Sequence, residues 1–152
     1  EEIESLIARC CEIKAEVVEE DERDTGIRQI LNFGHTLGHG IEAVSGYGMM
    51  KHGEAVIWGM VGEAWMSFDR GYISEEAFSE LLRGLTRLSL PDLPGNLTDS
   101  ELLKYIKRDK KVRSGVINSV LLSEPGKDVK VEEVSEAELK GAWDFLTDLE
   151  VN

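Results

Sequence analysis

The chain has 152 residues, about the size of one domain, and 41% of them are hydrophobic, which is ordinary for a globular protein with a core. Its formal net charge of −13 excludes nucleic acid as a natural partner, because the phosphates would be repelled. The negative charge remains compatible with a small anionic substrate, since binding such a substrate needs only a few local cations. The two cysteines, Cys10 and Cys11, are adjacent and predict no disulfide framework, which fits a cytoplasmic location.

Helical spacing of apolar residues, together with capping residues, predicts a mainly α-helical domain with one short β-hairpin. The expected helices are residues 1–19, 25–44 with Thr25 as its cap, 52–70, 74–88, 98–108 and a final helix from a capping box at 135–138. The expected strands are residues 116–123 and 129–134, joined by a turn. The helix 52–70 is apolar nearly all round, which predicts a central place in the core. Its apolar run, 55–66, contains Glu63 and is too short to cross a bilayer, so neither a membrane span nor a signal peptide is expected.

One stretch of the second expected helix is polar in an unusual way. If it is a continuous helix, spacings of four, three and four place four side chains on one face: Arg28, Asn32, His35 and His39. A guanidinium, a carboxamide and two imidazoles do not form a packing surface, so this face predicts a site for a polar ligand or a metal. Gly34 and Gly38 interrupt it and lower helix propensity by up to about 1 kcal/mol each, which indicates that another segment approaches closely.

The third histidine, His52, follows a glycine-rich turn that would let the next helix fold back on the first. His35 or His39 would then share a metal ion with His52. Catalytic zinc usually takes three protein ligands and one open position, so a carboxylate is still required. Glu42 and Glu54 are close in sequence, but Glu54 is two residues from His52 and points elsewhere on a helix. Ordinary hydrogen-bonded histidines are the alternative, and the gathering of all three in one short stretch disfavours it.

A set of motifs runs in order along most of the chain. They are Lys14-Ala-Glu-Val-Val18, Asp21-Glu22, Gly26-Ile-Arg28, Leu31-Asn-Phe-Gly-His-Thr-Leu-Gly-His39, Ile41-Glu42, His52-Gly-Glu-Ala-Val56, Gly59-Met60, Asp109-Lys-Lys111 and Val120-Leu-Leu122. Together they resemble the 3-dehydroquinate synthase family. The resemblance implies that residues 1–152 form its mainly helical C-terminal domain, which binds metal and substrate, without the N-terminal nucleotide-binding domain.

The resemblance also implies an activity. Members of the family convert 3-deoxy-D-arabino-heptulosonate 7-phosphate, a small anionic sugar acid phosphate, to 3-dehydroquinate and phosphate in the shikimate pathway of aromatic amino acid biosynthesis. They use a divalent metal, zinc or cobalt, and NAD bound mainly by the N-terminal domain, and they form homo-oligomers, usually dimers. Because that domain and a third metal ligand, a glutamate, lie outside this sequence, we expect the chain alone to be inactive.

The resemblance assigns roles to individual residues. His35 and His52 correspond to the two metal-ligating histidines, whereas His39 corresponds to a histidine near the substrate phosphate, where it would move protons. The substrate-binding positions are Lys14, Arg28, Asn32, His39 and Lys110, of which Lys14 and His39 are also predicted to be catalytic.

Three alternatives remain at this point. Another sugar phosphate cyclase would keep the metal histidines and change the substrate contacts, and the joint presence of Asn32, His39 and Lys110 argues against it. A metal-dependent alcohol or glycerol dehydrogenase would share the two-domain layout. The chain could also be a non-catalytic isolated domain that binds metal weakly. Two departures from the family pattern are Gly40, which replaces alanine, and Ile117-Asn118, where a basic residue is common.

Overall fold

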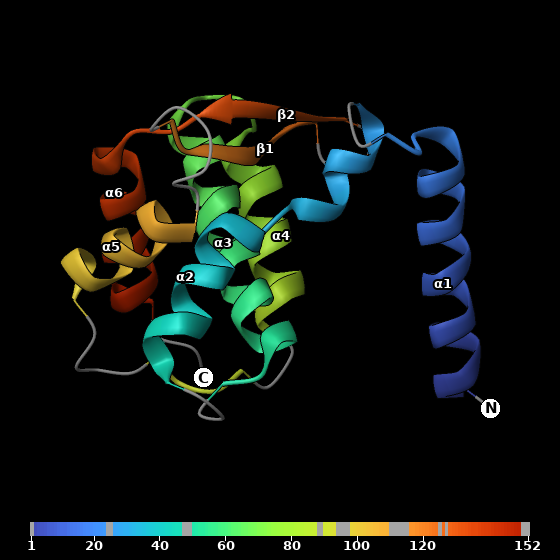
Figure 1. The fold of residues 1–152 in the computed structure, drawn as a ribbon, viewed down its shortest axis with the longest axis horizontal. Coiled ribbons are helices and arrows are strands. Elements are labelled where there is room, and N and C mark those ends of the chain that lie inside the picture. The colour runs from blue at the N-terminus through green and yellow to red at the C-terminus, as the bar shows by residue number, and fades with distance from the viewer. Residues whose placement is uncertain are drawn as a thin grey trace. The chain divides into compact units, whose positions relative to one another are not determined.

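The structure is a computed structural model that describes residues 2–23, 26–46, 50–87, 90–93, 98–109, 116–124, 126 and 128–149. The chain forms two compact units, Glu1–Asn32 and Phe33–Asn152. The elements are α1 (Glu2–Glu20), the 3₁₀ helix η1 (Ile27–Asn32), α2 (His35–Ser45), α3 (His52–Asp69), α4 (Glu75–Thr86), α5 (Asp99–Asp109), β1 (Asn118–Glu124), β2 (Asp128–Glu133) and α6 (Glu136–Asp148) (Figure 1). The predicted helical domain with one hairpin is confirmed. Within the described residues, no helix combines the length and apolarity needed to cross a membrane.

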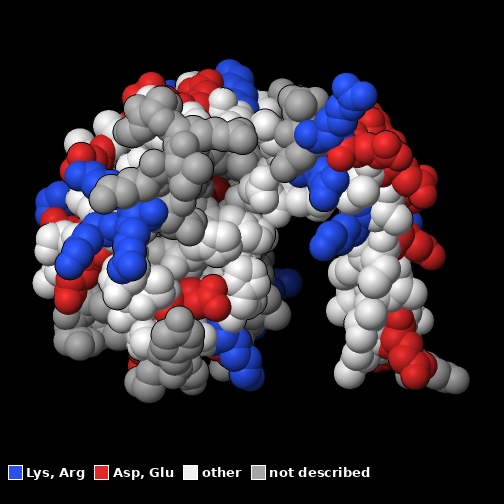
Figure 2. Space-filling model, viewed as in Figure 1, with Lys and Arg blue, Asp and Glu red and all other residues white. Residues whose placement is uncertain are grey.

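The first unit consists of α1 and η1. None of the side chains of α1 is buried, and its apolar residues Ile3, Leu6 and Ile7 are exposed. Acidic side chains are prominent along this helix, at the right of Figure 2. After α1, the Asp21 carboxylate accepts hydrogen bonds from the backbone N–H groups of Gly26 at 2.7 Å and Arg28 at 3.3 Å. Asp21 therefore holds the start of η1, while Thr25, the predicted cap, lies outside the described residues.

The prediction of one continuous helix over 25–44 is wrong. The 3₁₀ helix ends at Asn32, and α2 begins at His35 after Gly34, whose φ of 82° is in the left-handed region. The cause is packing: a Cβ on Gly34 would lie 2.6 Å from the carbonyl oxygen of Val56 and 2.8 Å from the backbone nitrogen of Met60. His35 and His39 therefore share a helix, but Arg28 and Asn32 belong to a different element, so the four-residue face does not exist as predicted.

The second unit is built around α3, as predicted. This helix contacts α2, α4, α6 and β1 (Figure 1). Its side chains Trp58 and Met66 are almost fully buried in the core. The neighbouring helices contribute fully buried leucines, among them Leu37 from α2 and Leu139 from α6. A helix covered on several sides can be apolar nearly all round, because it presents no face to water.

The contact between α2 and α3 is unusually close, as the glycines indicated. A Cβ on Gly38 would lie 3.0 Å from the Cα of Val56, and a Cβ on Gly59 would lie only 1.9 Å from the carbonyl oxygen of Gly34. Glycine at these positions lets the two helix backbones touch. This contact fixes how the start of α2 lies against α3.

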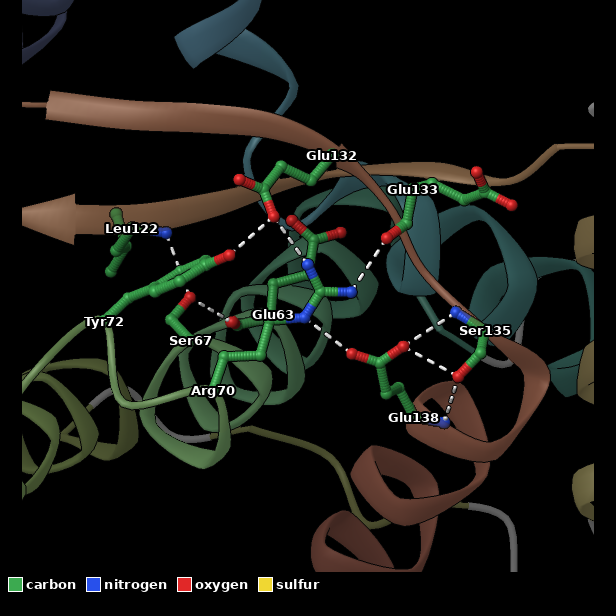
Figure 3. A network of polar contacts seen from close by, with 9 residues as sticks. All are labelled: Glu63, Ser67, Arg70, Tyr72, Leu122, Glu132, Glu133, Ser135 and Glu138. Atoms are coloured by element: carbon green, nitrogen blue, oxygen red, sulfur yellow. Dashed lines mark hydrogen bonds and ion pairs between the residues drawn. The ribbon is translucent and has the colours of Figure 1, made fainter.

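The hairpin packs against α3 as well. β1 and β2 are antiparallel, with Val120 opposite Val131, close to the predicted strands. The backbone N–H of Leu122 in β1 donates to the Ser67 hydroxyl at 2.9 Å, and that hydroxyl donates to the carbonyl oxygen of Glu63 at 2.7 Å (Figure 3). A buried serine of α3 therefore joins the sheet to the central helix.

Candidate metal and substrate site

All three histidines converge where α2 packs against the start of α3. His35 and His39 lie one turn apart on α2, and His52 is the first residue of α3. One ring nitrogen from each lies within 4.8 Å of one from each of the others. The ring centroids are 5.4 Å apart for His35–His39 and 5.6 Å apart for the other two pairs. The predicted approach of His35 and His52 is present, while their role as metal ligands stays a prediction.

A buried carboxylate positions the helix that carries two of these histidines. Glu63 of α3 is fully buried, and its two oxygens accept hydrogen bonds from the backbone N–H groups of Gly34 at 2.7 Å and Thr36 at 3.1 Å. The first N–H groups of a helix have no partner within it, so this carboxylate caps α2 from outside. Burial raises the pKa of Glu63 to about 7, and the hydrogen bonds from Gly34 and Thr36 oppose that rise.

Sequence reasoning noticed Glu63 only as a charge within an apolar run. The signal that could have identified its role is that Glu63 is a single acidic residue surrounded by apolar residues in a helix predicted to be buried. An ionisable group at such a position needs hydrogen-bond donors inside the protein. Which donors they are depends on the contact between α2 and α3, which the sequence does not display.

Two hydrogen bonds set the orientation of the imidazoles. Nδ1 of His52 lies 2.9 Å from a carboxylate oxygen of Glu42, and Nδ1 of His35 lies 3.3 Å from the carbonyl oxygen of Phe33. Both oxygens can only accept, so in the neutral imidazoles the proton is on Nδ1 and the lone pair is on Nε2. Histidines that ligate metals are commonly held in this way by a carboxylate or a carbonyl.

The second carboxylate near His52 has a structural role. An oxygen of Glu54 accepts a hydrogen bond from the backbone N–H of Lys51 at 2.7 Å, which caps the start of α3. This capping contact is consistent with the prediction that Glu54 does not face His52. Of the two glutamates considered from the sequence, Glu42 is the one that contacts a histidine.

A groove between α2 and α5 begins at His39. One hollow of about 350 Å³ is lined by Thr36, His39, Gly40, Ala43, Tyr105, Ile106 and Arg108. A second, of about 480 Å³, shares His39, Ala43, Tyr105 and Arg108 and reaches Glu42 and Met50. Basic side chains gather over α5, at the left of Figure 2. Arg108 therefore places a local cation beside His39, and sequence reasoning did not single it out.

Both departures from the family pattern take part in packing near the site. A Cβ on Gly40 would lie 2.7 Å from Leu102 and 2.9 Å from Ile106, so glycine here lets α5 approach α2. The replacement of alanine by glycine at this position thus goes with a close contact between α2 and α5. The backbone oxygen of Asn118 accepts a hydrogen bond from the Thr36 hydroxyl at 3.1 Å, next to His35.

The remaining predicted substrate residues belong to the first unit or lie outside the described residues. Lys14 is exposed on α1, and Arg28 donates from its guanidinium to the carbonyl oxygen of Glu22 at 3.3 Å. Both belong to the first unit, as does Asn32. Lys110 lies outside the described residues. The substrate role of these four residues stays a prediction.

Comparison with known sequences identifies relatives. The family model described as the 3-dehydroquinate synthase C-terminal domain matches residues 1–112. The 3-dehydroquinate synthase of Pelobacter propionicus is 48% identical over 118 residues, covering 78% of this chain and 33% of the relative. That of Thermodesulfovibrio yellowstonii is 45% identical over 137 residues, covering 90% and 38%. The chain thus spans only about a third of the length of these relatives.

Solved structures agree with the sequence relatives. A 2-deoxy-scyllo-inosose synthase complexed with carbaglucose-6-phosphate, NAD+ and Co2+ superposes with a TM-score of 0.82 at 25% identity, covering 97% of this chain and 41% of the other. A 2-epi-5-epi-valiolone synthase from Streptomyces hygroscopicus subsp. jinggangensis, with NAD+ and Zn2+ bound, has a TM-score of 0.77 at 22% identity and shares the fold, covering 95% and 40%. With nearly three quarters of its residues matched by the family model, this chain belongs to the 3-dehydroquinate synthase family and corresponds to its C-terminal domain.

Proposed function

We propose that this chain is the metal- and substrate-binding part of a 3-dehydroquinate synthase, which converts 3-deoxy-D-arabino-heptulosonate 7-phosphate to 3-dehydroquinate and phosphate. The observation that carries this proposal is the convergence of His35 and His52, with ring nitrogens within 4.8 Å, in a chain of this family. They are the two histidines that the family resemblance assigns to a metal.

The donor set suits a divalent transition metal. Neutral imidazole is a preferred ligand of zinc and of its first-row neighbours, whereas magnesium and calcium prefer oxygen. The two related solved structures hold Co2+ or Zn2+ together with NAD+. When bound, the metal would polarise a substrate hydroxyl, and NAD, held mainly by the nucleotide-binding part, would supply the hydride chemistry. His35 and His52 would hold the metal from this chain.

The other residues of the chain would bind and orient the substrate. Lys14, Arg28, Asn32 and Lys110 would contact its carboxylate, phosphate and hydroxyl groups. His39 would hold the phosphate region and move protons there. Arg108 lines the same groove as His39 and would add a further positive charge beside it. A few placed cations are sufficient to bind a small anion even though the chain as a whole is acidic.

The test joins this chain to the nucleotide-binding part of the Pelobacter propionicus relative. With NAD+ and Zn2+ or Co2+, the chimera should release phosphate from the heptulosonate substrate. His35→Ala and His52→Ala chimeras should release none, and the 152-residue chain alone should be inactive. Turnover by the chain alone, or by both histidine variants, would refute the proposal.

A second candidate is another sugar phosphate cyclase, favoured by the likeness to 2-deoxy-scyllo-inosose synthase. The same chimera, supplied with glucose 6-phosphate, tests it, since phosphate would then be released from this sugar in place of the heptulosonate. Formation of NADH from glycerol would instead indicate the dehydrogenase alternative. A cytoplasmic location and a homo-oligomeric state are part of the proposal, and sedimentation of the chimera tests the latter.

A further inference from the structure

We propose that α1 is a docking helix whose apolar face binds the nucleotide-binding part of the protein, which lies in the portion of the relatives that this chain does not cover. The inference rests on the proposed function in taking that part as the partner, and it adds the surface by which the two parts meet. The starting observation is where apolar side chains are exposed. Among the described residues, six of the eight large exposed hydrophobic side chains belong to the first unit: Ile3, Leu6, Ile7, Ile13, Ile27 and Ile30.

The apolar side chains of α1 form one stripe along the helix. Spacings that alternate between three and four residues place five of them on the same face: Ile3, Leu6, Cys10, Ile13 and Val17. The side chain of Ile3 is 72% exposed and that of Leu6 is 65% exposed. Within the unit α1 contacts η1, and only Val17 and Val18 of the helix are partly buried. The greater part of the stripe, from Ile3 to Ile13, therefore stays exposed to water.

The opposite face of α1 has a different composition. It carries small or acidic side chains, Ala8, Glu12, Ala15 and Glu19, all of them exposed. A helix in a protein gains most of its stability by packing an apolar face, and a contiguous exposed apolar patch marks an interaction surface. One side of α1 thus suits water, and the other side suits a partner.

The charge of α1 restricts which partner can cover the stripe. The helix contains six glutamates and only two basic residues, Arg9 and Lys14. The Arg9 guanidinium already lies 3.1 Å from Glu12 and 3.8 Å from Glu16 of the same helix. A second copy would bring the same acidic helix, in a chain of net charge −13, so self-pairing is opposed by repulsion. The stripe therefore fits a different surface, apolar at its centre and with lysine or arginine at its rim.

Docking of α1 has a consequence for a predicted substrate residue. Lys14 lies between Cys10 and Val17 in the chain, at the edge of the stripe, and it is exposed. Binding of the stripe would fix the position of α1 and of the Lys14 stem only when the nucleotide-binding part is present. The same contact would then join the two parts and place this lysine.

The two cysteines of the chain provide a probe and its control. Both are exposed, with Cys10 at the centre of the stripe and Cys11 turned about 100° away around the helix. The experiment labels the 152-residue chain, and its chimera with the Pelobacter propionicus nucleotide-binding part, with a maleimide. Peptide mass spectrometry follows each thiol. In the chimera, labelling of Cys10 should slow by at least about tenfold, because its thiol is covered, while that of Cys11 should change by less than about twofold.

A pair of variants tests the stripe directly. Leu6→Asp in the chimera places a charge in the proposed interface, so the labelling rate of Cys10 should return to that of the 152-residue chain. Ala8→Asp adds the same charge to the opposite face and is the matched control, which should leave Cys10 protected. Circular dichroism of each variant checks that its helices are retained.

The remaining outcomes separate this inference from the proposed function. Equal labelling of Cys10 in chain and chimera would overturn the inference. Slow labelling of Cys10 in the chain alone would also overturn it, because this chain, or a second copy if the rate depends on concentration, would then cover the stripe. Phosphate release by a chimera whose Cys10 stays reactive would refute only the docking face. Protection of Cys10 without phosphate release would support the docking face and refute only the activity.

Discussion

The two ends of α3 carry polar clusters of opposite kinds. At its C-terminal end, the Arg70 guanidinium donates to Glu138 at 2.6 Å, to Glu132 at 2.7 Å and to the carbonyl oxygen of Glu133 at 2.8 Å (Figure 3). These contacts join α3 to β2 and to the start of α6. Donors and acceptors of opposite charge are matched within the chain, and only 19% of the Arg70 side chain is exposed.

At the N-terminal end, three groups of the same kind lie together near solvent. The side chain of His52 is 53% exposed, and the nitrogens that gather there are all potential ligands for the same ion. A network that matches its own charges holds the fold together, whereas a cluster of like ligands has a reason to exist only when something else binds to it. The same helix thus carries a network that holds the fold together at one end and the histidine cluster of the proposed function at the other.

Forcing α2 and α3 apart should have the largest effect on both ends. In Gly59→Ala the new Cβ would lie 1.9 Å from the carbonyl oxygen of Gly34, so the two helices must move apart. We expect the free energy of unfolding to fall by more than about 3 kcal/mol, with zinc binding lost as well. Urea denaturation and zinc titration measure the two quantities.

The matched control for that variant is Gly84→Ala on α4, where no atom lies within 4 Å of the added Cβ. Alanine at this exposed helical position should stabilise the protein by up to about 1 kcal/mol. Equal effects of the two substitutions would show that backbone contact is not what positions the histidines.

The pH dependence of stability should separate the buried acid from the Arg70 network. The pKa of Glu63 is raised to about 7, so its stabilising contribution is present below pH 4.5 and is lost as pH rises towards 7, by up to about 3 kcal/mol. The Arg70 hydrogen bond lowers the pKa of Glu138 to about 2, so its contribution is present above pH 4.5 and is lost as pH falls towards 2.

Denaturation series from pH 2 to 8 measure these opposite slopes. Glu63→Gln should flatten the fall between pH 4.5 and 7, and Glu138→Gln should flatten the rise below pH 4.5. A parent curve that rises through the whole range, and that Glu63→Gln leaves unchanged, would contradict the assignment of a raised pKa to Glu63.

Arg70→Ala should affect stability without affecting the histidines. It leaves the partly buried carboxylates of Glu132 and Glu138 without their cation, which we expect to lower the free energy of unfolding by about 2 kcal/mol. Zinc affinity should stay as in the parent chain, and calorimetry measures both. Arg83→Ala, on the exposed surface of α4, serves as the control. A parallel fall in zinc affinity would mean that the two ends of α3 are coupled.

Glu42→Ala should have the smallest effect, and only at the histidine end. Removing the carboxylate that orients His52 should weaken zinc binding by about tenfold, while stability should change by less than about 0.5 kcal/mol because the pair is exposed. Glu42→Gln keeps a hydrogen-bond acceptor, so its zinc affinity should lie between those of the parent chain and Glu42→Ala. If Glu42→Ala instead lost all zinc binding, the glutamate would itself be a ligand.

Much of the fold was predictable because its signals are local. The Ser135 hydroxyl accepts from the backbone N–H of Glu138, and Ser74 likewise accepts from Ala77, so α6 and α4 begin where their capping residues predicted. A cap acts on the first turn that follows it, within three residues. The apolar side chains of α3 likewise predicted its central place, because a helix that is apolar nearly all round must be buried on most sides.

The sequence by itself therefore determined the helices, the hairpin and the family, and it singled out all three histidines. Only the tertiary structure decided that the chain breaks at Gly34, that Glu63 caps α2 from another helix, and that His39 joins His35 and His52. These features depend on the backbone contact between α2 and α3, formed by residues 17 or more positions apart in the sequence. Periodicity and spacing describe one element at a time, whereas a site formed where two helices meet depends on how closely they pack.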